Sequence, residues 1–248
     1  MHFAASALID ESLRNPGLFY RNNVSVTIAL LEVLVQNRVP NLIFSSSAAV
    51  YGEPKQVPIG ESHPTTPMNP YGETKLVIER ALDWYHRAHR INCVALRYFS
   101  AAGAADELGE DHVPETHLRP RLLDAALNPE RTFQIYGDDY PTPDGTCIRD
   151  FVHVRDIAQA HILALSAIPS PGFRIYNVGH GKGYSIREVV KAVQEVTGRE
   201  LPIRVATRRP SSVGGESGEA MPRGKVAASI LRAQDRLEFS LGLETGPP

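Results

Sequence analysis

The feature of this sequence that most restricts its fold is the alternation of short apolar runs with longer segments of helical periodicity. Short apolar runs bounded by turn residues are typical of buried strands, and apolar residues spaced three and four apart are typical of helices that cover a sheet. The pattern predicts an α/β fold with a parallel sheet covered on both faces, whose ligands collect at the carboxyl ends of the strands. Strands are predicted at 1–5 (the end of a strand), 41–46, 91–99, 174–178 and 201–205, and helices at 22–36, 71–89, 156–168 and 185–198.

Composition excludes several other classes of protein. With 42% apolar and 22% charged residues the chain is ordinary for a soluble globular protein, and a net charge of −2 offers no electrostatic footprint for nucleic acid. Two cysteines argue against a disulfide framework, and His2, His153 and His161 lack the spacing of metal ligands, so we interpret these histidines as packing residues. No apolar run approaches the ~20 residues of a membrane span, and no signal peptide is evident. We expect a cytoplasmic protein without a metal, nucleic-acid or membrane partner.

The first candidate for chemistry is the pair Tyr71 and Lys75. Asn69 can cap a helix and Pro70 suits its first turn, so the phenol and the ammonium fall one turn apart on one face. A lysine beside a tyrosine favours the phenolate and lowers the tyrosine pKa toward neutrality. A hydroxyl from the serine run 45–47, at the end of a predicted strand, would complete a proton relay. The same spacing is common on amphipathic helices, so the pair alone is weak evidence of catalysis.

Five motifs that occur in order give the pair a context. They are HFAA at 2–5, SSSAAVYG at 45–52, NPYGETK at 69–75, LRYF at 96–99 and YPTPDGTCIRDFVHV at 140–154. Together they resemble the extended short-chain dehydrogenase/reductase family, in its branch of nucleotide-sugar epimerases. The resemblance implies an NAD-binding Rossmann-type doubly wound parallel sheet, incomplete at the N-terminus, with a smaller α/β substrate-binding domain. It divides the chain into a cofactor domain (1–100, with 151–178 returning to it), a UDP-sugar domain (101–150 and 179–210) and a divergent tail (211–248) that is expected to be disordered.

The resemblance also implies a mechanism and its residues. Bound NAD would take hydride from carbon 4 of a UDP-hexose while Tyr71 takes the hydroxyl proton; the 4-keto sugar would rotate, and hydride and proton would return to its other face. Lys75 would lower the pKa of Tyr71 and hold the nicotinamide ribose, and Ser47 would bridge sugar and Tyr71. The positions matching NAD contacts are Phe3, Ala4, Ala5, Asn22, Ser45, Ser46, Tyr71, Lys75 and Phe99. The positions matching UDP-sugar contacts are Ser47, Ser100, His117, Leu118, Gln134, Ile135, Tyr136, Arg149 and Arg209.

Some of these positions have plainer interpretations. Arg149 is next to Asp150 and could form a structural ion pair, His117 could be a solvated loop residue, and the serines could only cap the strand end. Ala48 and Ala49 stand where related 4,6-dehydratases carry acidic residues, which favours epimerisation. Which UDP-sugar is used stays open among glucose/galactose, their N-acetyl forms and xylose/arabinose.

Three departures from the family pattern raise an alternative to an active epimerase. No Gly-x-x-Gly-x-x-Gly turn follows a strand, Ser100 stands where the family has Asn, and the sequence from Ser211 onward is unrelated. We therefore expect this polypeptide alone to bind NAD poorly, as the product of a mis-started and frame-shifted gene. The alternative to an epimerase is a non-catalytic remnant that binds nucleotide sugar but not NAD. The resemblance further implies a homodimer formed through the helices at 22–36 and 71–89.

Overall fold

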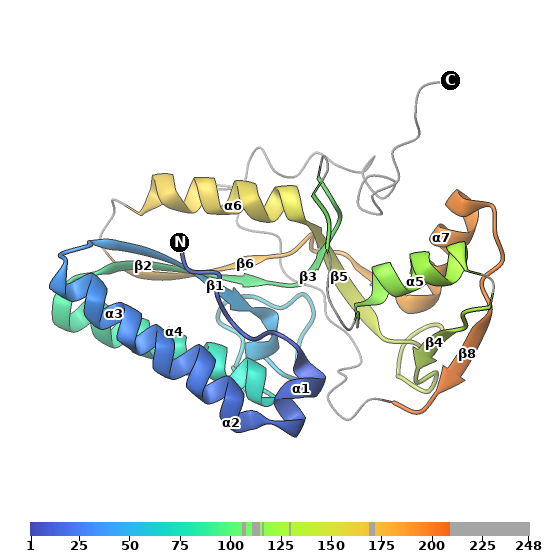
Figure 1. The fold of residues 1–248 in the computed structure, drawn as a ribbon, viewed down its shortest axis with the longest axis horizontal. Coiled ribbons are helices and arrows are strands. Elements are labelled where there is room, and N and C mark those ends of the chain that lie inside the picture. Colours follow the sequence, from blue (N-terminus) through green and yellow to red (C-terminus); the bar gives the residue numbers. More distant parts are fainter. Residues whose placement is uncertain (106–107, 111–114, 116, 129, 169–171, 209–248) are drawn as a thin grey trace, which may run out of the picture.

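The computed structural model describes residues 1–105, 108–110, 115, 117–128, 130–168 and 172–208, which form two lobes (Figure 1). The larger lobe contains a parallel sheet of three strands in the order β1 (Asn41–Ser47), β2 (Asn92–Tyr98) and β6 (Phe173–Val178). Beyond β1, His2 forms an isolated parallel bridge with Phe44. The predicted strand end at 1–5 is thus reduced to one bridge.

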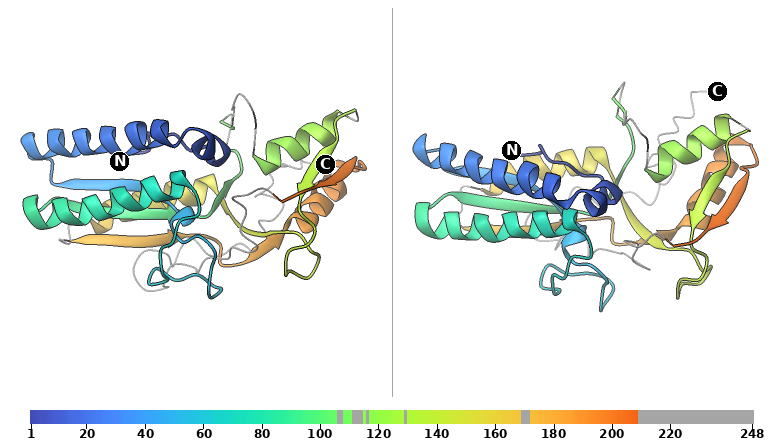
Figure 2. Two further views of the ribbon diagram at one scale, coloured as in Figure 1. Left: turned by 90° about the horizontal axis from the view of Figure 1, so that it is seen from below. Right: turned by 60° about the horizontal axis from the view of Figure 1, so that its bottom comes forward.

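Helices cover both faces of this sheet (Figures 1 and 2). α3 (Val26–Gln36) and α4 (Pro70–His89) lie on one face, and α6 (Val154–Ala167) lies on the other. Alternate strand residues point to opposite faces: Leu42 and Phe44 pack beneath α3 and α4, whereas Ile43 packs beneath α6. The predicted α/β fold with parallel strands is confirmed.

The ends of the helices show which local signals were interpreted correctly. Asn69 caps α4 by accepting a hydrogen bond from the Gly72 amide, with Pro70 in the first turn, as predicted. The prediction that Asp156 caps α6 is wrong. The helix begins at Val154 and is capped by the ring of His153. Asp156 lies in its first turn, where the positive end of the helix dipole stabilises a carboxylate.

The first helical segment is longer than predicted. α1 (Ile9–Arg14) precedes α2 (Pro16–Phe19), which continues through a π-helix (Tyr20–Ser25) into α3. The run Pro16–Gln36 is 21 residues with a hydropathy of 1.3, long and apolar enough to cross a membrane by length and composition alone, contrary to our prediction that no run approaches that length. In the structure this run packs against α4 and the sheet, with Leu31 completely buried.

The smaller lobe packs two helices against two strands. α5 (Leu118–Leu127) and α7 (Ile186–Thr197) share an apolar core with β4 (Phe133–Tyr136), which pairs in parallel with β8 (Ile203–Ala206). The predicted capping box of α7 is present, since Ser185 and Glu188 exchange hydrogen bonds. The predicted assignment of the lobes to cofactor and UDP-sugar stays a prediction.

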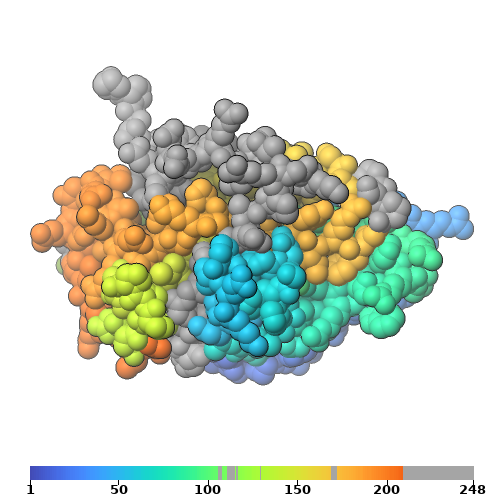
Figure 3. Space-filling view, turned by 180° about the vertical axis from the view of Figure 1, so that it is seen from behind, coloured from blue at the N-terminus to red at the C-terminus, as the bar shows by residue number. Residues whose placement is uncertain are grey.

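Three short strands connect the lobes. β5 (Ile148–His153) pairs in parallel with β3 (Ser100–Ala102) through its second half and antiparallel with β7 (Gly183–Ser185) through its first half. β1 leads into a 3-10 helix (Ala48–Val50) and then into the proline-containing loop 52–69, which lies on the surface between the lobes (Figure 3).

Candidate active site

Three side chains of α4, each one helical turn from the next, are held by three consecutive serines of β1. Tyr71 is hydrogen-bonded to the Ser47 side chain, and Lys75 Nζ donates to the Ser45 carbonyl oxygen at 2.7 Å. The third is Glu79, whose Oε1 accepts from the Ser46 hydroxyl at 2.6 Å. We call these six residues the α4–β1 row. The structure thus brings together Tyr71, Lys75 and Ser47, the three residues predicted to act in catalysis.

Lys75 is an ammonium in an apolar setting. The residue is only 3% exposed, and its Nζ lies 4.9 Å from the centroid of the Phe44 ring and 5.7 Å from that of Tyr71. Burial lowers the pKa of Lys75 to about 8, against the opposing effect of the Glu79 charge. The ammonium is therefore mostly charged at neutral pH and loses its proton in weak base.

Tyr71 differs from the prediction in the direction of its pKa. Burial raises the pKa of Tyr71, and the hydrogen bond with Ser47 opposes that shift only in part. The predicted lowering by Lys75 is not found because the ammonium is directed at the Ser45 carbonyl rather than at the phenol oxygen. Without a ligand, Tyr71 is protonated at neutral pH.

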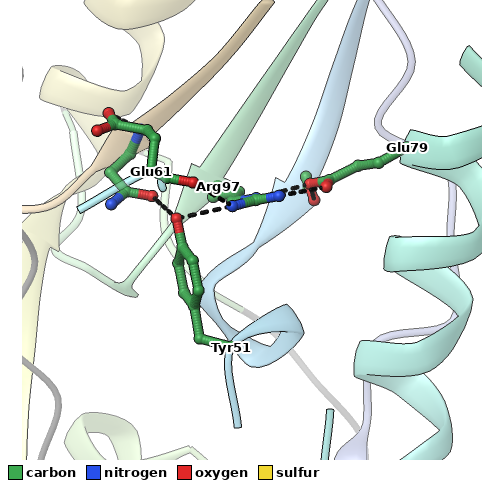
Figure 4. Close-up of polar contacts among 6 residues, drawn as sticks. Tyr51, Glu61, Glu79 and Arg97 are labelled. Atoms are coloured by element: carbon green, nitrogen blue, oxygen red, sulfur yellow. Dashed lines mark hydrogen bonds and ion pairs between the residues drawn. The ribbon is translucent and has the colours of Figure 1, made fainter. Parts of the chain in front are cut away.

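A buried polar network that was not predicted from the sequence extends from Glu79, one end of the row (Figure 4). Arg97 donates from Nε and one Nη to both carboxylate oxygens of Glu79, at 2.9 and 2.6 Å. Its other Nη donates to the Tyr51 hydroxyl at 2.8 Å, and that hydroxyl donates to the side-chain oxygen of Asn177 at 2.6 Å. The signal was an arginine between apolar residues of a buried strand, because a buried charge needs a partner.

A second missed group lies on the α6 side of the sheet. The Tyr98 hydroxyl is 2.7 Å from His161 Nε2, and it also hydrogen-bonds with the Ser45 side chain. Burial raises the pKa of Tyr98 to about 12. His161 Nδ1 contacts the Ile157 carbonyl, which agrees with the predicted packing role of this histidine.

Asn22, whose predicted contact with NAD stays a prediction, lies next to Asn23, the buried amide near the row. Asn22 is exposed and donates to the Ser6 hydroxyl, whereas Asn23 is buried and hydrogen-bonds the Ser6 backbone and the Thr74 hydroxyl. The π-helix at Tyr20–Ser25 shifts the register at this point, so a helical period of 3.6 residues does not indicate which asparagine faces inward.

The remaining predicted NAD contacts lie in different surroundings. Phe3 and Ala4 are exposed beside the His2 bridge and Ala5 is half-buried, with the Phe3 ring centroid 4.7 Å from that of His161. The Ser46 hydroxyl is taken by Glu79, and Phe99 is buried beneath the loop 52–69. The phenol, ammonium and serine groups of the row fit the nicotinamide-ribose end of NAD. The sequence holds no glycine-rich turn that would hold the pyrophosphate.

The predicted UDP-sugar contacts are mostly on or near the second lobe. His117 is exposed at the start of α5, where its ring contacts Glu110 and Glu115, and Leu118 packs on the core of the lobe. On β4 the Tyr136 hydroxyl donates to Gln134 at 3.0 Å, whereas the side chain of Ile135 is buried in that core.

The other two predicted contacts that the structure describes border β5. Ser100 begins β3, opposite Phe151 of β5, and Arg149 Nη1 donates to the Ile148 carbonyl. The neighbouring Asp150 is buried and accepts from the backbone amides of His180 and Gly181. Arg209 and the tail 211–248 lie outside the described residues.

A group of potential cation ligands lies beside α5. Glu110, Glu115 and His117 each offer one ligand atom, and these atoms lie within 4.8 Å of one another. The group borders a surface cavity of about 630 Å³ that is also lined by Arg121 and Arg131. Side chains this exposed commonly gather without an ion, so they do not overturn the expectation that the chain has no metal site.

Comparison with known proteins identifies the family. The NAD dependent epimerase/dehydratase family matches residues 1–179. A curated UDP-glucose 4-epimerase from Halalkalibacterium halodurans is 47% identical over 251 residues, which covers 100% of this chain and 71% of the relative. UDP-glucose 4-epimerase from Brucella ovis, solved in complex with NAD, has a TM-score of 0.84 at 48% identity and covers 88% of this chain and 68% of that one.

A further solved structure extends the likeness over nearly the whole chain. The Bifidobacterium longum enzyme, in complex with NAD+ and UDP, also has a TM-score of 0.84, at 37% identity over 99% of this chain and 71% of its own. These findings confirm the predicted resemblance to nucleotide-sugar epimerases. The chain belongs to the NAD-dependent epimerase/dehydratase family.

Proposed function

We propose that this chain carries the proton-transfer site of a UDP-glucose 4-epimerase, with Tyr71 as acid and base. The observation that carries the proposal is the hydrogen bond between Tyr71 and Ser47 at the carboxyl end of β1, with the buried ammonium of Lys75 one turn away. Ligands of parallel α/β sheets bind at that end of the strands. UDP-glucose 4-epimerases at 47 and 48% identity support this reaction over the other sugar pairs.

The residues divide the chemistry among themselves. Ser47 orients the phenol. Tyr71 is protonated in the free chain, so it must first lose its own proton to solvent. As the phenolate it then accepts the proton of the sugar 4-hydroxyl, holds it and returns it. Lys75, mostly charged below its pKa of about 8, stabilises negative charge that develops on Tyr71. When bound, NAD would accept hydride from carbon 4 of the sugar and return it to the other face, and its oxidised form would add a positive charge that favours the phenolate. Ala48 and Ala49 leave no carboxylate beside Ser47, which disfavours the elimination that dehydratases catalyse.

The second lobe offers groups suited to a uridine diphosphate. Gln134 and Tyr136 provide an amide and a phenol on one strand, and Arg149 provides a guanidinium at the junction of the lobes. A guanidinium fork matches paired anionic oxygens, so we assign Arg149 to the diphosphate. His117 and Leu118, at the start of α5, complete the proposed binding side.

A coupled assay for conversion of UDP-galactose to UDP-glucose with added NAD tests the proposal. Tyr71→Phe should lower kcat by about 10²- to 10⁴-fold, the usual contribution of a positioned acid/base group. Tyr85→Phe is the matched control, because Tyr85 lies on the same helix with its hydroxyl bonded to Glu32 of α3. Equal rates in the Tyr71→Phe variant and the unaltered chain would contradict the assignment.

The second candidate function is binding of a nucleotide sugar without NAD. It is favoured by Gln134, Tyr136 and Arg149, which offer groups suited to a uridine diphosphate independently of the α4–β1 row. Calorimetric titration with UDP and, separately, with NAD distinguishes the two. Binding of UDP alone supports the second candidate, whereas submicromolar NAD binding excludes it.

We also propose that the chain forms a homodimer through α3 and α4. These helices lie side by side on the outside of the larger lobe (Figure 2), and their surface leaves Val26, Val33 and Trp84 exposed, Trp84 at 67%. Exposed large apolar side chains on adjacent helices favour an interface. Trp84→Glu should convert a dimer mass to a monomer mass in light scattering, whereas Ile162→Glu, at an exposed site on α6, should not.

A further inference from the structure

Glu79 is the member of the α4–β1 row to which no role was predicted. It is only 2% exposed and lies one turn after Lys75, which itself lies one turn after Tyr71. Both of its carboxylate oxygens are bound by Arg97 of β2, and one of them also accepts from Ser46 of β1. A single carboxylate on α4 is thereby fixed to two adjacent strands.

We propose that Glu79, clamped by Arg97 and Ser46, is a positioning residue that fixes Tyr71 and Lys75 in register with the serines of β1. The inference rests on the proposed function, because it concerns the same proton-transfer site. It assigns Glu79 and Arg97 no contact with substrate. They act through the helix and strand that carry the reacting groups.

The register needs a directional contact because apolar packing does not define one. α4 is held on the sheet by side chains such as Ile78 and Leu82, whose contacts tolerate small shifts and rotations. A slip of α4 by one residue turns its face by about 100°, which removes Tyr71 from Ser47. A guanidinium fork on both oxygens of Glu79 restricts distance and orientation together.

Stability alone does not explain this ion pair. Burying an arginine and a glutamate requires removal of water from both charges, and apolar residues of similar volume often stabilise a fold as well or better. Here the cost of desolvation is offset by hydrogen bonds from all three nitrogens of Arg97: two of them donate to Glu79, and the third donates to Tyr51 and the Glu61 carbonyl. The network then extends to Asn177 of β6, so all three strands of the sheet take part.

Glu79 also influences the charge state of Lys75. The groups that face the ammonium are Tyr71 and Glu79 from α4, Phe44 and the Ser45 carbonyl from β1, and His2 from the N-terminal segment. Arg97, from β2, stands behind Glu79 and is ion-paired with it. Burial works against the ammonium and the Glu79 charge works for it, so removal of that charge should make the proton of Lys75 easier to lose.

An NMR titration of the full chain with ¹³C-labelled lysine side chains tests the proposal. The sequence has five lysines, and a Lys75→Met variant identifies the Lys75 signal. Glu79→Gln keeps the shape of the side chain but removes its charge and leaves Arg97 unpaired. We expect the proton affinity of Lys75 to fall about tenfold in this variant.

Two further variants keep the test decisive. Glu79→Gln with Arg97→Met leaves no unpaired buried charge, so it folds where the single variant fails; there we expect a fall of about threefold. Asp83→Asn is the matched control, because it removes a carboxylate one turn further along α4 whose ion pair with Arg87 is exposed. That variant should leave the Lys75 titration unchanged.

The opposite result is equally clear. Loss of the Glu79 charge shifts the Lys75 titration by itself, so the register is measured by the nuclear Overhauser contact between the Tyr71 ring and Ser47. If both Glu79 variants unfold more easily but keep that contact as in the unaltered chain, Glu79 only stabilises the fold and the proposal is overturned. The titration needs neither NAD nor UDP-sugar. A chain that shows the shift but lacks epimerase activity would therefore contradict the proposed function and leave the role of Glu79 in place.

Discussion

The two lobes hold their predicted functional residues in different ways. In the larger lobe Lys75, Glu79 and Arg97 are buried, and the α4–β1 row joins helix to strand by directional hydrogen bonds. In the smaller lobe His117 is exposed, and its ring contacts carboxylates of Glu110 and Glu115 close to it in sequence. The α4–β1 row is therefore part of the core of the larger lobe, whereas His117 lies on the surface of the smaller lobe.

The difference follows from what each proposed site has to do. Proton transfer requires the donor and acceptor to lie within a few tenths of an ångström of a productive geometry, so its groups need a rigid shell. A nucleotide brings its own shape and charge, and side chains that bind it can adjust on contact. Both lobes have exposed ion pairs, such as Asp83–Arg87 in the larger lobe and Arg131–Asp124 in the smaller one. Among the described residues, the buried pair Arg97–Glu79 belongs to the larger lobe.

The largest expected effect comes from breaking one ion pair in each lobe. Arg97→Met leaves the charge of Glu79 buried and unpaired, and it should lower the free energy of unfolding by about 3–5 kcal/mol. Arg131→Met removes an exposed pair in the smaller lobe and should cost under about 1 kcal/mol. Urea denaturation measures both by circular dichroism, and the fluorescence of Trp84, the one tryptophan of the sequence, reports on α4. Equal losses would show that burial does not distinguish the lobes.

The second prediction uses pH to isolate Lys75. Its pKa falls from 10.5 to about 8 on folding, so between these values the unfolded chain binds a proton that the folded chain does not, and stability rises with pH. The free energy of unfolding of the unaltered chain, minus that of Lys75→Met, should grow by about 2 kcal/mol from pH 8 to pH 10. Groups such as Cys93, whose pKa burial raises to about 12, are present in both proteins and cancel.

A parallel experiment on the smaller lobe serves as the control. Lys191→Met removes an exposed lysine of α7, so its difference from the unaltered chain should not change over the same pH range. A constant difference for Lys75→Met as well would mean that Lys75 keeps its ordinary pKa in solution. In that case the buried Lys75 and the exposed Lys191 would contribute to stability with the same dependence on pH.

The features that could be predicted from the sequence are those that depend on local signals. The alternation of strands and helices indicated the sheet, and Asn69-Pro70 placed the start of α4, because both signals are local. The pair Tyr71 and Lys75 and the serine run 45–47 were found because a spacing of four and the end of a strand are visible in a sequence. The resemblance then singled out Ser47 as the serine beside Tyr71.

What could not be predicted depends on contacts between distant segments. Glu79 and Arg97 pair across 18 positions, and a glutamate on an amphipathic helix ordinarily faces water. Asn22 was predicted from the resemblance alone, and the burial of its neighbour Asn23 depends on a π-helix that has no clear sequence signal. The raised pKa of Tyr71 depends on burial, which a spacing of residues does not report.

The smallest expected effect comes from the helix caps, one in each lobe. Asn69 caps α4 and Ser185 caps α7, each by accepting a backbone amide hydrogen bond. Asn69→Ala and Ser185→Ala should each lower the free energy of unfolding by about 1 kcal/mol, because each leaves a helix N-terminus with an unsatisfied amide. The two losses are expected to be alike, since a cap is a local contact.

The caps should differ in a second measurement on the same variants. Tyr71 lies in the first turn of α4, so fraying there after Asn69→Ala should loosen its hydrogen bond with Ser47 and lower the epimerase rate by more than the loss of folded protein explains. The first turn of α7 carries no residue proposed for proton transfer, so Ser185→Ala should lower the rate only in proportion to unfolding. If the two variants lose activity equally, the position of Tyr71 does not depend on the start of α4. The α4–β1 row would then be held from its Glu79 end alone.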